Sequence, residues 1–152
     1  MRKYPPEIVR QKMVAWCNKA ERCQWDIRNK LIEWLIPASE RESLIAEFIS
    51  NNLINEARYA SAFTNDKSRF NQWGSKKIKM HLKQKGISEF NIKTAIQQID
   101  QTEERKTILA LIKKKESKLQ GLKEYERRGK LYRFLLSKGF DIQVISAVLG
   151  EL

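Results

Sequence analysis

One pattern of apolar residues recurs about every fifty residues, and it constrains the fold more than any other feature of the chain. The pattern is clearest in the middle of the sequence, at Ile78, Leu82, Gly86, Ile92, Ala95 and Ile96. The positions 53 residues further on are Leu131, Leu135, Gly139, Ile145, Val148 and Leu149. The positions 47 residues before Ile78, Leu82, Ile92 and Ile96 are Leu31, Leu35, Ile45 and Ile49. The chain is therefore predicted to contain three copies of one unit.

Each copy is predicted to contain a hairpin of two helices. In the middle copy Ser75 is expected to cap a helix over residues 76–85, because its hydroxyl can accept a free backbone N–H. Gly86 can take the left-handed conformation that ends this helix. Ser88 then caps the next helix, and Ile87 before it is expected to pack against that helix as a hydrophobic staple.

The outer copies carry related signals. In the third copy, Gly139 and Asp141 stand where a terminating glycine and a cap are expected. In the first copy, Pro37 is expected to stop the helix, and Ser39 with Glu42 has the spacing of a capping box.

A further helix is predicted before each hairpin, over residues 7–20, 56–70 and 103–128. Asn55 is expected to cap the second of these helices. Gly121 is the point at which the third can break, because glycine in a helix interior costs about 1 kcal/mol relative to alanine.

These helices predict an all-α fold of three tandem three-helix repeats that form an elongated, curved array. We expect the repeats to span residues 1–54, 55–101 and 102–152. A unit of this size buries little apolar surface alone, so stacking against its neighbours should complete its core.

The chain is strongly basic, with 30 Lys and Arg against 18 Asp and Glu and a formal net charge of +12. Residues 1–50 carry nine basic and seven acidic side chains, residues 66–93 carry eight and two, and residues 105–133 carry eleven and three. A surface this basic favours nucleic acid, an acidic protein surface or an anionic membrane as partner. Binding residues are therefore expected in the C-terminal two thirds of the chain.

Several classes of function are not supported by the sequence. No stretch is long and apolar enough to cross a membrane, and the N-terminus lacks the apolar core of a signal peptide, which predicts a cytoplasmic protein. Cys17, Cys23 and the single histidine, His81, are too few for a zinc site, and the thiols are expected to be semi-buried packing residues. No phosphate-binding loop or catalytic constellation is present, so we expect no cofactor, no metal and no enzymatic activity.

A run of lysines occupies the second predicted helix of the middle copy. At 100° per residue, Lys76, Lys79 and Lys83 form a stripe roughly opposite Ile78 and Leu82. This stripe is either a solvated face that keeps the protein soluble, or a surface for an acidic filament or for DNA phosphate. The candidate binding residues of this helix are Lys76, Lys77, Lys79, Lys83 and Lys85.

The largest concentration of positive charge lies in the third copy. It lacks the acidic residues at i+4 that a merely solvated helix often has, which favours binding to an anion. Tyr125, Tyr132 and Phe134 lie within it and either pack or stack on bases. The candidate binding residues here are Lys113, Lys114, Lys115, Lys118, Arg127, Arg128, Lys130 and Arg133.

The segment NNLINEARYASAFTNDKSRFNQWGSKKIKMHLKQKGIS, residues 51–88, resembles the central repeat of the RecX family, bacterial regulators of the recombinase RecA. That pattern has an acidic pair, Arg-Phe-Ala, a Gly followed by basic residues, and then an apolar residue, Leu and Lys-Gly-Ile. Segments 20–34 and 128–149 resemble the first and third repeats more loosely. Asn55 and His81 depart from the acidic residues that are common in the family. The matching positions are Asn55, Glu56, Arg58, Tyr59, Ala60, Trp73, Gly74, Lys76, Lys77, Ile78, Leu82, Lys85, Gly86 and Ile87.

The resemblance implies a regulator that binds the RecA filament on single-stranded DNA and reduces its ATP hydrolysis, strand exchange and coprotease activity. A monomer is expected, because each end of the chain is predicted to cap itself with short helices. The resemblance also implies a role in DNA repair, homologous recombination and the SOS response, and some members also touch DNA. Arg58 and Arg69 in the same segment join the candidate partner-binding residues. The residues expected to shape the motif are Tyr59, Phe63, Trp73, Gly74, Ile78, Leu82, Gly86, Ile87, Gly139 and Phe140.

The alternative is a helical module that binds nucleic acid non-specifically and has no recombinase partner. Three-helix units are also the shape of helix-turn-helix DNA readers. Such readers present Arg, Asn or Gln to base edges, whereas the second helices here present mostly Lys, which suits phosphate contact.

Overall fold

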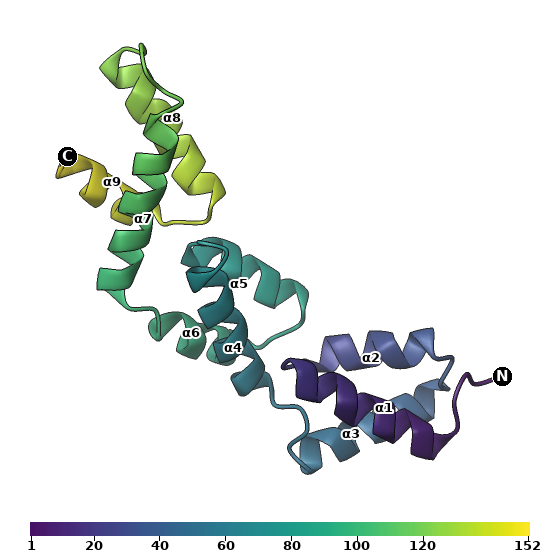
Figure 1. Ribbon diagram of the computed structural model, residues 1–152. Coiled ribbons are helices and arrows are strands. Elements are labelled where there is room, and N and C mark those ends of the chain that lie inside the picture. The colour runs from purple at the N-terminus through teal and green to yellow at the C-terminus, as the bar shows by residue number, and fades with distance from the viewer.

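The computed structural model describes residues 1–152 and consists of nine α-helices without strands. The helices follow one another as three groups of three, and each group surrounds an apolar core (Figure 1). The predicted all-α fold of three tandem three-helix repeats is confirmed. The helices are α1 (Pro6–Lys19), α2 (Gln24–Glu33), α3 (Ala38–Ser50), α4 (Glu56–Arg69), α5 (Ser75–Gln84), α6 (Glu89–Gln97), α7 (Gln101–Glu116), α8 (Glu124–Ser137) and α9 (Ile142–Gly150).

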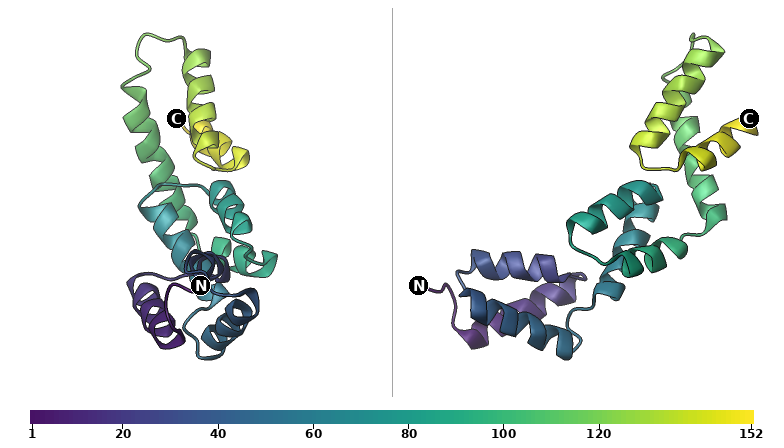
Figure 2. Two further views of the ribbon diagram at one scale, coloured as in Figure 1. Left: turned by 90° about the vertical axis from the view of Figure 1, so that its right-hand side faces the viewer. Right: turned by 180° about the vertical axis from the view of Figure 1, so that it is seen from behind.

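The molecule is elongated and curved, as predicted. The three groups succeed one another along a bent path, and the N- and C-termini lie in different end groups (Figure 1). Helices α7 and α8 run side by side as a hairpin that projects away from the first six helices (Figure 2). We call the groups α1–α3, α4–α6 and α7–α9 the first, second and third units.

The helix-ending signals of the second and third units are confirmed. Gly86 and Gly139 have φ values of +75° and +97°, the left-handed conformation expected after α5 and α8. The side chains of Asn55, Ser88 and Asp141 each accept a backbone N–H at the start of α4, α6 and α9. Local sequence therefore determines where these helices begin and end.

The register of the first unit differs from the prediction. The repeat pattern aligns Leu35 with Leu82, but Leu35 is the structural equivalent of Gly86, because it follows α2 with a φ of +59°. Leu35 is accordingly 56% exposed, and the buried pair on α2 is Ile27 and Leu31. The prediction that Leu35 is a core residue is wrong. Left-handed turns usually contain glycine, so the leucine gave no signal that the helix ends here.

The predicted cap at Ser75 is also wrong. Helix α5 begins at Ser75 itself, after Gly74, and no side chain caps it. Instead the Lys76 N–H donates to the Gly139 carbonyl oxygen over 2.9 Å, and the Gly74 N–H donates to the Lys138 carbonyl oxygen over 2.8 Å. Backbone carbonyls of the third unit thus replace the hydroxyl cap.

One further boundary differs from the predictions, and one predicted helix break is confirmed. Helix α3 begins directly after Pro37 without a capping box, and Glu42 binds Arg28 instead. The helix predicted over residues 103–128 is broken into α7 and α8 at Gly121, the residue at which a break was predicted. The chain turns between them through Gly121, which has a φ of +86°, and this turn buries Leu119 in the third core.

The first and second units meet through side chains. Cys23, at the start of α2, is fully buried in the core of the second unit beside Tyr59. Lys85 Nζ lies 2.6 Å from Asp26 Oδ1, and Arg58 Nε lies 2.6 Å from Glu21 Oε2. This junction differs from the next one, which is made by backbone hydrogen bonds.

Candidate interaction surfaces

The lysine stripe of α5 lies on the outer face of the helix. Lys76, Lys79 and Lys83 are exposed, whereas Ile78 and Leu82 are fully buried on the opposite side. Lys76 Nζ lies 3.7 Å from an Asp141 carboxylate oxygen, a long and exposed pair that contributes little. Lys79 and Lys83 form no ion pair within the protein and line a shallow depression with Met80 and Gln84. Of the lysines on α5, Lys79 and Lys83 are therefore the most available to a partner.

The other two lysines of this helix have internal contacts. Lys85 pairs with Asp26 and lies 4.2 Å from the centre of the Trp25 ring. Lys77 lies 4.7 Å from the centre of the Trp73 ring. The structure therefore places Lys85 in the junction between units, and it separates Lys77 and Lys85 from the exposed stripe.

Sequence reasoning missed two lysines that contact the loop between α4 and α5, at Trp73 and Asn71. Lys67 lies 5.0 Å from the centre of the Trp73 ring, and Lys138 donates from Nζ to the Asn71 carbonyl oxygen over 3.0 Å. Burial lowers the pKa of Lys138, and the positive charges of Lys77 and Lys114 lower it further. The fold thus gathers basic side chains from α4, α5, α7 and the end of α8. In the sequence, the only indication of this cluster is that Lys67 and Lys77 lie within six residues of Trp73.

The hairpin of α7 and α8 carries a second basic surface at its far end. Lys115, Lys118, Lys130 and Arg133 line a groove whose apolar wall includes Phe134. Lys115 Nζ lies 5.0 Å from the centre of the Phe134 ring. We call this groove the hairpin-tip groove. Lys113 and Lys114 are exposed on α7 outside it.

Two arginines predicted to bind a partner are held internally. Arg127 contacts Glu116 at 2.5 Å and Glu124 at 2.9 Å, and so ties α8 to the end of α7. Arg128 lies 3.9 Å from Glu124. These carboxylates raise the pKa of Arg127, and the Arg127 guanidinium lowers the pKa of Glu124. The prediction that this surface lacks acidic residues at i+4 is therefore wrong for α8, because Glu124 lies four residues before Arg128. Glu116 is a further acidic partner, and it lies on the neighbouring helix.

Arg58 and Arg69 occupy different positions. Arg58 binds Glu21 and donates to the carbonyl oxygens of Asn52 and Leu53, so it holds the chain entering α4. Arg69 is exposed at the C-terminal end of α4 and has no ion pair.

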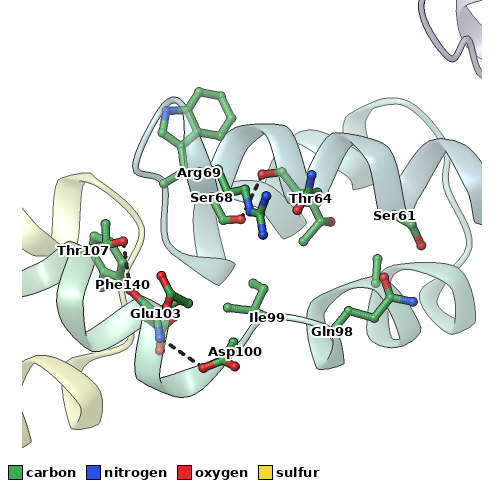
Figure 3. A pocket seen from close by; sticks show the side chains of 14 residues that line it. Ser61, Thr64, Ser68, Arg69, Gln98, Ile99, Asp100, Glu103, Thr107 and Phe140 are labelled. Carbon is green, nitrogen blue, oxygen red and sulfur yellow. Dashed lines mark hydrogen bonds between the residues drawn. The ribbon is translucent and has the colours of Figure 1, made fainter.

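Arg69 lies at the rim of a cleft between the second and third units (Figure 3). The cleft has a volume of about 390 Å³ and lies between α4, the end of α6 and the start of α7. Its polar lining includes Thr64, Ser68, Gln98, Glu103 and Glu104. We call it the interunit cleft.

The motif residues form the framework of the second unit. Tyr59 stacks on Phe63 with ring centres 5.9 Å apart, and Phe63 meets the edge of Trp73 at 6.3 Å. Ile87 is buried in the same core. Phe140, by contrast, is buried in the third core and lines the interunit cleft. The aromatic residues therefore link the second unit to the third.

The structure contains no group of three or more His, Cys, Asp or Glu side chains that could hold a metal ion. None of its helices combines the length and the apolar character that crossing a bilayer requires. Burial raises the pKa of Cys17 to about 11 and that of Cys23 to about 12.

Two segments of the chain match models of known domains. Residues 55–96 match the second three-helix domain of RecX, and residues 102–149 match the third. The regulatory protein RecX of Clostridium perfringens (strain 13 / Type A) is 31% identical over 156 residues, which cover 96% of this chain and 73% of that protein. The one from Neisseria gonorrhoeae (strain NCCP11945) is 27% identical over 146 residues, covering 95% and 91%.

Other relatives are matched over a shorter part. The regulatory protein RecX of Clostridium botulinum (strain Eklund 17B / Type B) is 37% identical over 102 residues, and the match spans 47% of its length. The crystal structure of RecX from Lactobacillus salivarius has a TM-score of 0.85 to this chain at 21% identity, covering 96% of this chain and 95% of that one. This likeness shows that the folds are the same.

Proposed function

Because this chain belongs to the RecX family, we propose that it is a regulator that binds the RecA filament on single-stranded DNA and restrains its activity. The relatives that carry this proposal are named regulatory protein RecX, and one of them aligns with 96% of the chain. We further propose that it acts in the cytoplasm as a monomer, by binding rather than by catalysis. Its three units are proposed to span residues 1–54, 55–101 and 102–152.

The shape of the molecule supports binding to an extended partner. Three units in a curved row present more surface to a filament than a compact domain of the same length (Figure 2). The unpaired lysines Lys79 and Lys83 and the hairpin-tip groove are the surfaces proposed to meet acidic protein or phosphate.

The alternative is non-specific binding to nucleic acid without a recombinase. The hairpin-tip groove favours it, because it combines four cationic side chains with a half-buried aromatic residue, Phe134. Cationic grooves with aromatic residues are typical of single-strand binding sites.

Steady-state ATP hydrolysis by the cognate RecA on single-stranded DNA tests the proposal. The protein should inhibit hydrolysis in a titration at near-physiological salt. The double variant Lys79→Glu/Lys83→Glu tests the stripe, and Lys118→Glu/Lys130→Glu tests the hairpin tip. Lys19→Glu/Lys93→Glu is a control with the same charge change, because both lysines are exposed and form no ion pair.

The outcomes separate the two functions. Inhibition that one test variant loses and the control keeps would support a filament regulator and identify its surface. Unchanged hydrolysis at excess wild-type protein, together with intact DNA binding, would favour the alternative.

A further inference from the structure

The interunit cleft is acidic, whereas the protein as a whole is basic. Three carboxylates line it, from Asp100, Glu103 and Glu104, against the single guanidinium of Arg69. Asp100 is engaged in capping α7, and Glu103 lies 3.6 Å from Lys106. Glu104 forms no ion pair and no side-chain hydrogen bond. Burial raises its pKa, as does the negative charge of Asp141.

A buried hydroxyl in the same cleft also lacks a partner. Thr64 is only 3% exposed, and its Oγ1 forms no hydrogen bond within the protein. Buried polar atoms are almost always hydrogen-bonded, so this one needs an explanation. Thr64 lies on the α4 wall of the cleft, which places the free hydroxyl beside the space that a ligand would fill (Figure 3).

The backbone around the cleft adds to its preference for a cation. Helices α4 and α6 both end there, and the C-terminal end of a helix carries partial negative charge. The N-terminal N–H groups of α7, which would attract an anion, are already bound by Asp100. The inner wall is apolar, with Trp73, Ile99 and Phe140.

We propose that the interunit cleft binds an arginine side chain presented by a protein partner. A guanidinium offers five N–H donors and can meet the Glu104 carboxylate and the Thr64 hydroxyl together. The proposal goes beyond the proposed function, which concerns basic surfaces, because it assigns a site for the opposite charge.

Binding is tested on the full chain alone, with Nα-acetyl-arginine amide as the probe and backbone amide NMR as the readout. The probe should shift the amides around Thr64, Ser68 and Glu104 in a saturable way. Nα-acetyl-citrulline amide has the same shape without the charge, and it should cause no comparable shifts. Because RecA and DNA are absent, the result is independent of the regulatory function.

Three variants make the test specific. Glu104→Gln and Thr64→Val keep the side-chain shapes, and each should weaken probe binding, the former by about tenfold or more. Arg69→Gln should tighten it, because it removes the only positive charge lining the cleft. Glu89→Gln, an exposed change on α6, is the control and should have no effect.

Three results would overturn the proposal. The first is no saturable shift at the cleft with the wild-type chain. The second is equal binding of the citrulline probe. The third is stronger binding of spermidine than of the arginine probe at the same amides, which would make the cleft a polyamine site.

Discussion

Gly74 and Gly139 are 65 positions apart in the sequence and lie against each other at the junction between the second and third units. A Cβ added at Gly74 would overlap the Gly139 carbonyl and the Phe140 amide nitrogen. A Cβ added at Gly139 would overlap Lys77. The absence of side chains here allows the two backbones to approach closely enough for the hydrogen bonds that cap α5.

We expect Gly74→Ala to destabilise the protein by about 1–3 kcal/mol, the usual cost of overpacking. The methyl group would meet backbone atoms, which cannot move aside as a flexible side chain can. Urea unfolding followed by circular dichroism measures the change. Gly150→Ala is the matched control, because nothing lies within 4 Å of its added Cβ, and equal losses for both variants would contradict the prediction.

The ion pair between Lys85 and Asp26 should stabilise the first junction. Asp26 retains 13% side-chain exposure, so removing its partner leaves a nearly buried charge. Lys85→Met keeps the aliphatic stem over Trp25 and should cost about 1–2 kcal/mol of unfolding free energy. Lys83→Met, on the exposed stripe, should cost almost nothing. A double-mutant cycle with Asp26→Asn measures the coupling, and a coupling of zero would show that the pair contributes no stability.

Arg127 and Lys118 should behave differently in single-stranded DNA binding, although both belong to the basic third unit. Each phosphate contact contributes about 0.7 to the slope of log K against log salt for single strands. Lys118→Gln should reduce this slope by about that amount if the hairpin-tip groove contacts phosphate. Arg127→Gln should leave the slope unchanged and lower thermal stability instead, because Arg127 binds Glu116 and Glu124. The reverse pattern would place the contact at Arg127.

Glu104 should make stability depend on pH in an unusual direction. Because its folded-state pKa is raised, the folded protein holds this proton more tightly than the unfolded chain. The contribution of Glu104 to stability is therefore fully present below the pKa of the unfolded chain. It is lost as the pH rises through the folded-state pKa. Glu104→Gln should raise the melting temperature at pH 7, and the gain should shrink as the pH falls below that pKa. A variant that is less stable than the wild type at pH 7 would mean that the carboxylate has a stabilising partner.

The repeat architecture could be read from the sequence because it depends on local signals. The burial of Ile78 and Leu82 and the glycine turn after α5 follow from spacing that one helix imposes on itself. Leu35 escaped the same reasoning, because a leucine in a left-handed turn carries no compositional signal.

The roles of individual charges could not be read in this way. Lys79 and Lys85 look alike in sequence, yet Lys85 meets a carboxylate that lies 59 residues away. A helical projection gives the direction of a side chain but not the neighbour on the next unit. The interunit cleft was missed for the same reason, since its walls come from α4, α6 and α7.

The open row of units leaves the protein with an excess of surface. Its accessible area is 9512 Å², whereas a compact protein of 17.9 kDa exposes about 8,000 Å². The difference, about 1,500 Å², is nearly twice the roughly 800 Å² that each partner buries in a standard protein–protein interface. The isolated chain thus lacks hydrophobic stabilisation that a compact fold of the same length would gain by burying more surface. A partner that covers the row of units should therefore raise the melting temperature and bind with a negative heat-capacity change. Calorimetry measures both.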